Sequence, residues 1–277
     1  MLFRSEVTCY AEIGSADNMT RYIRDLADRF VEIQTLADAD LADRIRADGI
    51  DILVDLKGYT HEARPLVLAL QPAPLRVAWL GYPASTGRGL NDYLLADLVV
   101  APPAHADQYG EALVWLPDSY QVNDDAQPAA GRTPSRDELG LPQTGCVFAC
   151  FNHVYKIEPR IFAAWMRILA RVPDSVLWLY ATHAPAAANL RREAAARGID
   201  PARLVFAGSA PKAEHLARLR QADLMLDTLL VNAHTGASDA LWAGLPLLTC
   251  PQDTFASRVA RSEEHTSELQ SRLHLVC

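Results

Sequence analysis

The stretch CVFACFNHVYKIEPRIFAAWMRILARVPDSVLWLY, residues 146–180, contains two short apolar runs separated by a segment of helix length. The runs at 146–151 and 175–180 are continuous in apolar residues rather than alternating, which is typical of strands buried on both faces of a sheet. Between them, apolar residues recur at i, i+4, i+7 and i+8 counted from Ile161, and Pro159 suits the first turn of a helix. The stretch therefore predicts a strand, a helix and a strand of a parallel sheet.

Similar apolar runs recur on both sides of this stretch. They are residues 51–56, 76–82, 97–101 and 112–117 upstream, and residues 203–208, 223–227 and 246–250 downstream. Residues 123–145 separate the two groups; they are rich in Pro, Gly, Asp and Ala and show no apolar periodicity, which indicates a linker. We therefore predict an α/β protein with two doubly wound lobes, residues 1–122 and 146–260.

Composition limits the classes of partner. The 277 residues carry a formal net charge of −8, and the chain has no long run of Lys or Arg. Broad binding to nucleic acid or to an anionic membrane surface needs a basic face, so we expect neither partner. The chain also has no apolar stretch of about 18 residues and no signal-peptide core at its start. We expect a cytoplasmic protein.

Polar residues follow three of the downstream strands. They are Asn152, His153, Tyr155 and Lys156 after the first; Ser209, Ala210, Lys212, His215 and Arg218 after the third; and Asn232, His234, Thr235 and Asp239 after the fourth. In doubly wound sheets, ligands bind outside the carboxyl ends of the strands, where helix N-termini point at the site. We therefore expect a ligand site at this edge of the second lobe.

The run VNAHTGASDALWAG, residues 231–244, predicts a helix that begins near His234. Free backbone N–H groups and the positive end of the helix dipole make such a start a phosphate site, and Thr235 adds a hydroxyl donor. Asp239 lies one turn further on the same side and can accept hydrogen bonds from ribose hydroxyls. On this stretch alone, an equally good interpretation is that Thr235 caps the helix and Asp239 sits favourably in its first turn.

The two other polar clusters favour the ligand interpretation. Lys156 can neutralise a leaving diphosphate. Lys212, His215 and Arg218 recur at i, i+3 and i+6; a solvent-facing stripe is the alternative, and for Arg218 taken alone it is the better one. These clusters contain no G-x-G-x-x-G, no Walker loop and no D-x-D pair to hold a divalent ion. The clusters therefore predict a nucleoside diphosphate pocket that works without a metal ion or other cofactor.

Several motifs resemble one family. FNHVYKIEP, APKAEH, NAHTGASDALWAGLPLLTCPQDTFASRVA, DGIDILVDLKGYT, PAPLRVAWLGYPASTG and LPDSYQVND are similar to the catalytic region of the protein O-linked N-acetylglucosaminyltransferases, glycosyltransferase family 41, including its Spindly-like members. The resemblance spans residues 5–260. It implies two Rossmann-like lobes of the glycosyltransferase B type and inverting, metal-independent transfer of N-acetylglucosamine from UDP-N-acetylglucosamine to Ser/Thr hydroxyls of proteins. It also implies tetratricopeptide repeats upstream in the full-length protein.

The resemblance also implies roles for the diphosphate-facing residues. Lys156 is the catalytic electrophile that helps UDP to leave. His153 stands where animal members have glutamine, against the phosphates. His234 and Thr235 bind phosphate. Gly236 stands where the family commonly has a second threonine, so one hydroxyl contact is lost while the backbone N–H remains.

On the nucleoside side, the resemblance makes Ala210 the backbone contact to uracil. His215 and Arg218 lie beside the base, and Lys212 and Asp239 lie by the ribose.

The first lobe gives weaker signals. Thr60, Gly81, Tyr82 and Pro83 lie in motifs that line the sugar and acceptor cleft in the family, but glycines and prolines after strands are more often turns, and we favour the turn. His61 and His105 have no partner pattern, so we expect two surface residues.

We expect a fragment of the catalytic region. The family's opening strand, helix and histidine motif do not precede residue 5, which leaves the first lobe incomplete. RSEEHTSELQS, within residues 261–277, matches the translation of a common sequencing adapter, so we expect a non-native tail. By itself the chain is then expected not to transfer sugar. Two alternatives stay open: an O-fucosyltransferase that uses GDP-fucose, as plant Spindly proteins do, and a non-catalytic nucleotide-binding or scaffold protein.

Overall fold

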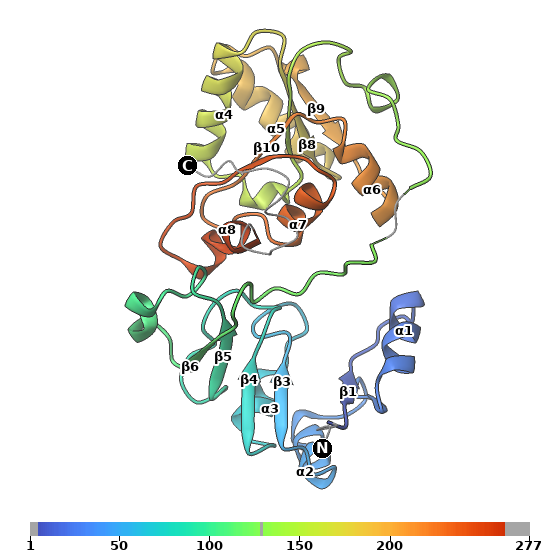
Figure 1. Ribbon diagram of the computed structural model, residues 1–277, viewed down its shortest axis with the longest axis vertical. Helices are drawn as coiled ribbons and strands as arrows, with labels where there is room; N and C mark the ends of the chain where they lie inside the picture. Colours follow the sequence, from blue (N-terminus) through green and yellow to red (C-terminus); the bar gives the residue numbers. More distant parts are fainter. Residues whose placement is uncertain (1–4, 128–129, 264–277) are drawn as a thin grey trace. The chain divides into compact units, whose positions relative to one another are not determined.

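The computed structural model describes residues 5–127 and 130–263, and the predicted tail lies outside them except for residues 261–263. The chain divides into two compact units (Figure 1). The first comprises residues 1–94 and 110–112, and the second comprises residues 95–109 and 113–277.

The second unit is built on a parallel sheet with the strand order β11-β10-β7-β8-β9. Its strands are β7 (Val147–Cys150), β8 (Val176–Tyr180), β9 (Leu204–Ala207), β10 (Leu224–Leu226) and β11 (Leu247–Leu248). All five lie within runs that the sequence predicted as strands. The predicted α/β fold with parallel sheets is therefore confirmed.

Helices cover both faces of this sheet. They are α4 (Pro159–Arg171), α5 (Ala184–Ala195), α6 (Lys212–Leu219), α7 (Thr235–Trp242) and α8 (Val259–Glu263). Alternate residues of β7 enter different cores: Val147 and Ala149 join one buried cluster, and Phe148 and Cys150 join the other. A strand with a core on each side has no polar face, which explains its continuous apolar run.

Helix α4 shows how the local sequence sets these elements. The side chain of Glu158 caps the helix by accepting hydrogen bonds from the backbone N–H groups of Arg160 and Ile161, at 2.6 and 2.8 Å. Ile161, Trp165 and Leu169 are buried in the core cluster that includes Phe148. The predicted amphipathic helix is confirmed.

The first unit contains shorter elements. Its helices are α1 (Asn18–Leu26), α2 (Asp38–Ala47) and α3 (Pro65–Ala69). Strands β1 (Thr8–Ala11) and β2 (Arg29–Glu32) form a parallel pair. Strands β3 (Ile52–Asp55), β4 (Leu75–Ala78), β5 (Tyr93–Ala96) and β6 (Ala112–Trp115) form a sheet in that order; β3 and β4 lie within the first unit, and β5 and β6 continue past its boundaries at residues 94 and 112. The second unit also contains short 3₁₀ turns, which are η1 (Pro103–Gln108), η2 (Asp137–Leu139), η3 (Val154–Lys156), η4 (Pro201–Arg203) and η5 (Phe255–Ser257).

Two expectations for the upstream strands are wrong. Residues 97–101 form a turn, because the Asp97 carboxylate accepts hydrogen bonds from the backbone N–H groups of Val99 and Val100, at 2.8 and 2.9 Å, and so ends β5. Strand β3 is not buried on both faces, since Ile52 is 55% exposed and Val54 is 42% exposed. In the described part of the chain β3 pairs only with β4, which makes it an edge strand.

Candidate active site

Lys156 lies in η3, directly after β7. Its ammonium group donates a hydrogen bond to the backbone carbonyl of Asn232, at 2.9 Å, in the loop that leads into α7. Burial lowers the pKa of Lys156, and attraction to the buried Asp227 opposes this effect. The contact brings together two segments that the sequence placed at one edge of the sheet.

Asp227 organises that loop, and the sequence analysis missed its role. Its Oδ1 accepts hydrogen bonds from the backbone N–H groups of Thr228 and Ala233, at 2.8 and 2.7 Å, and from the side chain of Asn152, at 3.0 Å. Its Oδ2 accepts from the hydroxyl of Thr249, at 2.7 Å. Burial raises the pKa of Asp227, and these hydrogen bonds oppose the rise. An aspartate that closes an apolar run was the available signal.

Helix α7 begins as expected, but Thr235 does not cap it. The N-cap is His234, and no side chain caps the helix. Among described residues, none accepts a hydrogen bond from the backbone N–H of Thr235 or of Gly236. The helix start therefore presents two free donors together with the hydroxyl of Thr235, which is the arrangement that binds phosphate.

His234 is held in its neutral form. Its Nε2 lies 3.1 Å from the backbone carbonyl of Ala256. Burial, followed by the nearby charge of Lys156, lowers the pKa of His234 to about 4, against the hydrogen bond to Ala256. At neutral pH the ring is a hydrogen-bond donor or acceptor rather than a cation.

A second cluster joins α6 to α7. Lys212 forms an ion pair with Asp239 Oδ1, and His215 Nε2 lies 3.9 Å from Asp239 Oδ2. Asp239 is 6% exposed. Burial, followed by the charge of Arg218, lowers the pKa of His215 to about 4, so its imidazole is neutral at pH 7. The structure thus brings Lys212 and His215 of α6 together with Asp239 of α7.

The solvent-facing interpretation of Arg218 is wrong, because the residue is only 8% exposed. Its Nη1 donates to the carbonyl of Gly208, at 2.8 Å, and its Nε donates to Nδ1 of His215, at 3.0 Å. The guanidinium lies 4.7 Å from the ring centroid of Phe151, which also contacts the ring of His215. Burial lowers the pKa of Arg218.

His153 stands apart from these contacts. Its exposed ring stacks on Tyr155, with a centroid distance of 5.6 Å, and meets the edge of Tyr180 at 5.4 Å. Ala210 lies in the segment that precedes α6 and lines a cavity together with Arg218. The structure thus places the residues of this edge in two clusters, one around Lys156 and His234 and one around Asp239 and Arg218.

In the first unit, the turn interpretation accounts for Gly81. A Cβ added there would lie 1.9 Å from the carbonyl oxygen of Leu56, so the backbones approach too closely for any other residue. The hydroxyl of Thr60 donates to the carbonyl of Lys57 in a local turn, at 2.8 Å. His61 is exposed as expected. His105 belongs to the second unit and has a partner there, since its Nδ1 lies 3.1 Å from Nη1 of Arg258.

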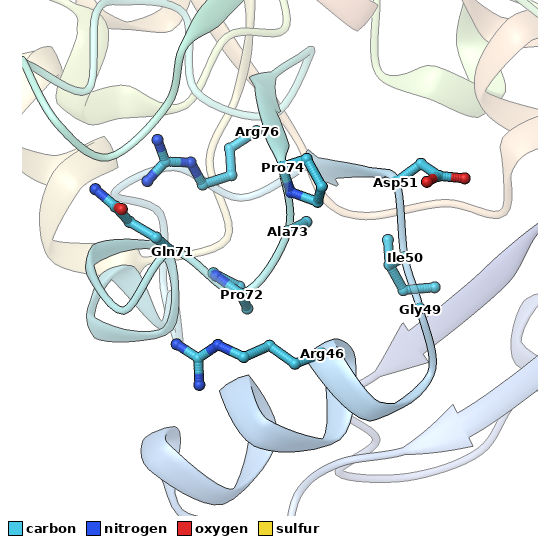
Figure 2. A pocket seen from close by; sticks show the side chains of 9 residues that line it. All are labelled: Arg46, Gly49, Ile50, Asp51, Gln71, Pro72, Ala73, Pro74 and Arg76. Carbon is cyan, nitrogen blue, oxygen red and sulfur yellow. The ribbon is translucent and has the colours of Figure 1, made fainter.

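The first unit contains a cavity of about 540 Å³, which is larger than the cavity lined by Ala210 and Arg218 (Figure 2). Figure 2 shows Asp51 and Pro74, which precede β3 and β4, at its wall, so it lies at the amino ends of these strands. Its two arginines already have carboxylate partners: Arg46 pairs with Asp43 and Arg76 pairs with Asp92. Size alone therefore does not identify the site.

The described residues offer neither a metal site nor a membrane-spanning helix. Residues 5–127 and 130–263 contain no cluster of three or more His, Cys, Asp or Glu side chains that could hold a metal ion. No helix in those ranges combines the length and apolar character that crossing a membrane requires.

Comparisons with known proteins place these features in context. A sequence model of the family described as Glycosyl transferase family 41 matches residues 3–131 and 127–271. A probable UDP-N-acetylglucosamine–peptide N-acetylglucosaminyltransferase of Arabidopsis thaliana, SEC, is 42% identical over 93% of this chain and 27% of its own length. The SPINDLY protein of Petunia hybrida is 28% identical over 93% of this chain and 28% of its own length. The chain therefore spans less than a third of each of these two relatives.

Solved structures agree on the architecture. A lysine-to-methionine mutant of the O-GlcNAc transferase of Thermobaculum terrenum matches 98% of this chain and 51% of its own, with a TM-score of 0.86 and 32% identity. HepE of Anabaena, solved with UDP and glucose, matches 93% of this chain and 86% of its own, with a TM-score of 0.56 and 12% identity. At that identity, HepE shows a shared fold only.

Proposed function

Because the chain belongs to glycosyl transferase family 41, we propose that it forms part of the catalytic region of an enzyme that transfers N-acetylglucosamine from UDP-N-acetylglucosamine to Ser/Thr hydroxyls of proteins. The transfer inverts the anomeric centre and uses no metal. In this proposal the enzyme binds a nucleotide sugar and a protein acceptor, and it acts in the cytoplasm. The full-length protein carries tetratricopeptide repeats. The observation that carries the proposal is the junction of Lys156, through the carbonyl of Asn232, with the uncapped start of α7.

This junction suits a leaving diphosphate. The oxygen of the acceptor hydroxyl bonds to the anomeric carbon and loses its proton to water, while the bond from that carbon to the diphosphate breaks, so negative charge grows on UDP. Lys156 supplies a cation, and α7 supplies the amides of Thr235 and Gly236. Charge stabilisation that strengthens as the bond breaks lowers the barrier more than it tightens donor binding. His153, His234 and the Thr235 hydroxyl complete the phosphate contacts in this proposal.

The nucleoside is bound by the second cluster. We assign Asp239 and Lys212 to the ribose, and we assign Ala210, His215 and Arg218 to uracil. The carboxylate of Asp239 accepts from Lys212 in the structure, and a ribose hydroxyl is a further donor of the kind that it can accept. Since His215 is neutral, its ring can lie against a base without adding charge.

The two alternatives are less well supported. The SEC protein, at 42% identity, and the SPINDLY proteins, at 28%, are all named as probable UDP-N-acetylglucosamine–peptide N-acetylglucosaminyltransferases, so UDP-N-acetylglucosamine is favoured over GDP-fucose as the donor. A purely structural role gives no reason for an uncapped helix start beside a half-buried lysine.

The test is a transfer assay on the complete protein that carries this sequence. UDP-N-acetylglucosamine and GDP-fucose are offered separately with a Ser/Thr-rich peptide, and the product is identified by mass spectrometry. We expect addition of N-acetylhexosamine only. Transfer of fucose would select the first alternative, and no transfer from either donor, with binding of UDP intact, would select the scaffold.

A further inference from the structure

A cavity of about 340 Å³ lies in the second unit, between the start of α6 and the segment of residues 132–139. It is lined by Arg132, Pro134, Leu139, Ala210, Glu214 and Arg218. Two of these, Ala210 and Arg218, belong to the proposed uracil site. The wall that faces them comes from the segment that joins the two groups of strands, which the sequence suggested was only a linker.

This segment is fixed to the second unit. The guanidinium of Arg136 donates to the carbonyls of Gln221 and Gly145, at 3.2 and 3.0 Å, and pairs with Asp223, at 2.9 Å. Leu139 packs against the core on one face of the sheet. Polar and apolar anchors together hold the wall in place.

Glu138 closes a small loop within the wall. Its carboxylate accepts two hydrogen bonds from Arg132, at 2.8 and 2.6 Å, and one from the backbone N–H of Ser135, at 2.7 Å. These bonds tie residues 132 and 135 together across Pro134, whose own ring restricts the backbone further. Pro134 is thereby held as a firm part of the cavity lining.

The cavity has the character of a nucleobase site. Pro134 and Leu139 offer apolar surface, and such pockets combine apolar lining with a few placed polar groups. No described residue accepts a hydrogen bond from Nη2 of Arg218, so this donor remains for an acceptor on the base.

We propose that residues 132–139 form the outer wall of the nucleobase pocket, and that Pro134, held by the Glu138–Arg132 pair, packs against the base. This inference rests on the proposed function, and it adds a base-positioning element to it. The wall lines the base pocket and not the phosphate site, so its loss should weaken nucleotides and spare pyrophosphate.

The test measures the dissociation constants of UDP, GDP and inorganic pyrophosphate by calorimetry. The proteins are the 277-residue chain, Pro134→Ala, Glu138→Gln and the control Glu193→Gln. Glu193 pairs with Arg197 on the surface of α5, so the control removes a similar ion pair away from the cavity. We expect Pro134→Ala to weaken binding of UDP and GDP by about tenfold, which is the scale of a lost hydrophobic pocket contact.

The remaining outcomes are distinct. Glu138→Gln should act in the same direction as Pro134→Ala, with pyrophosphate binding unchanged in both. Equal changes for all three ligands, or an unchanged affinity for UDP in both variants, would overturn the wall proposal while leaving UDP binding intact. Failure of the unaltered chain to bind UDP at all would instead overturn the proposed function, and the wall proposal with it.

Discussion

Two strands with similar sequences, ILVD in β3 and VFAC in β7, have different surroundings. All four residues of β7 are buried, whereas Ile52 and Val54 of β3 are exposed. Strand β7 lies in the middle of a five-stranded sheet with a core on each face, and β3 is an edge strand. An apolar run therefore identifies a strand, but its burial depends on neighbours that the run does not encode.

The residues that follow these strands differ in the same way. Lys57, after β3, donates to the carbonyl of Glu62 in a local turn, at 2.9 Å, whereas Lys156, after β7, reaches the carbonyl of Asn232 in a distant loop. The sheet of the second unit brings distant segments together at its carboxyl edge. This difference predicts that paired substitutions in the two units will have unequal effects.

The largest expected contrast is between two aspartates. Asp227→Ala leaves the backbone N–H groups of Thr228 and Ala233 and the hydroxyl of Thr249 without their acceptor, and we expect it to lower the free energy of unfolding by about 3 kcal/mol. Asp55→Ala removes an acceptor that serves Lys57 and Gly58 in a partly exposed turn, where water replaces it, and we expect a loss of about 1 kcal/mol. Urea unfolding measures both. Equal losses would mean that Asp227 does not organise its loop.

The next contrast is between the two lysines. In the complete enzyme, we expect Lys156→Ala to lower kcat by about a hundredfold or more, the scale of an oriented group that stabilises transition-state charge. Lys57→Ala, which removes a matched lysine after a first-unit strand, should change kcat little. Steady-state kinetics separate kcat from KM. Loss of donor affinity with kcat intact in Lys156→Ala would contradict its catalytic role.

Alanine substitutions at two glycines should change the stability of the protein in opposite directions, with a smaller difference than for the two lysines. Gly81→Ala places a Cβ 1.9 Å from the carbonyl oxygen of Leu56, and we expect it to destabilise the protein by about 2 kcal/mol. Gly236 lies in the first turn of α7, where the nearest atom to an added Cβ is Asn152 Oδ1 at 3.9 Å. Gly236→Ala should therefore stabilise the protein slightly, by up to about 1 kcal/mol. Thermal unfolding tests both, and a stabilising Gly81→Ala would refute the close approach.

The smallest expected effect depends on pH. Folding lowers the pKa values of His215 and His234 from 6.5 to about 4. Between these two pH values the histidines are protonated in the unfolded chain and neutral in the folded chain. The contribution of these two histidines to the free energy of unfolding is complete above pH 6.5 and is lost as the pH falls from 6.5 towards 4. For the two together, the loss between pH 7 and pH 6 is about 1 kcal/mol.

Urea midpoints measured from pH 7 to pH 5 check this slope. The double variant His215→Gln/His234→Gln should flatten it, and His61→Gln, at an exposed first-unit position, should not. A slope that is unchanged in the double variant would mean that other groups cause the loss of stability.

The sequence predicted the second unit well, because each strand there has a core on both sides and so carries an uninterrupted apolar run. Strands β1 and β2 were missed, since TCYA and RFVE mix polar and apolar residues. The candidate site was predicted at the carboxyl edge because polar residues follow three of the strands, and parallel strands end at the same edge of a sheet. Burial of Arg218 was not, because it depends on Gly208 and Phe151, which lie far from it in the sequence or on another element. The Asp227 network was missed for the same reason.

The central claim is that the second unit holds a nucleoside diphosphate, with Asp239 at the ribose. Calorimetric titration of the unaltered chain and of Asp239→Ala with UDP and with pyrophosphate tests it most directly, because only UDP carries a ribose. We predict that Asp239→Ala weakens UDP by about tenfold, the scale of a hydrogen bond to a charged group, and leaves pyrophosphate binding nearly unchanged. Equal losses for the two ligands would contradict the account.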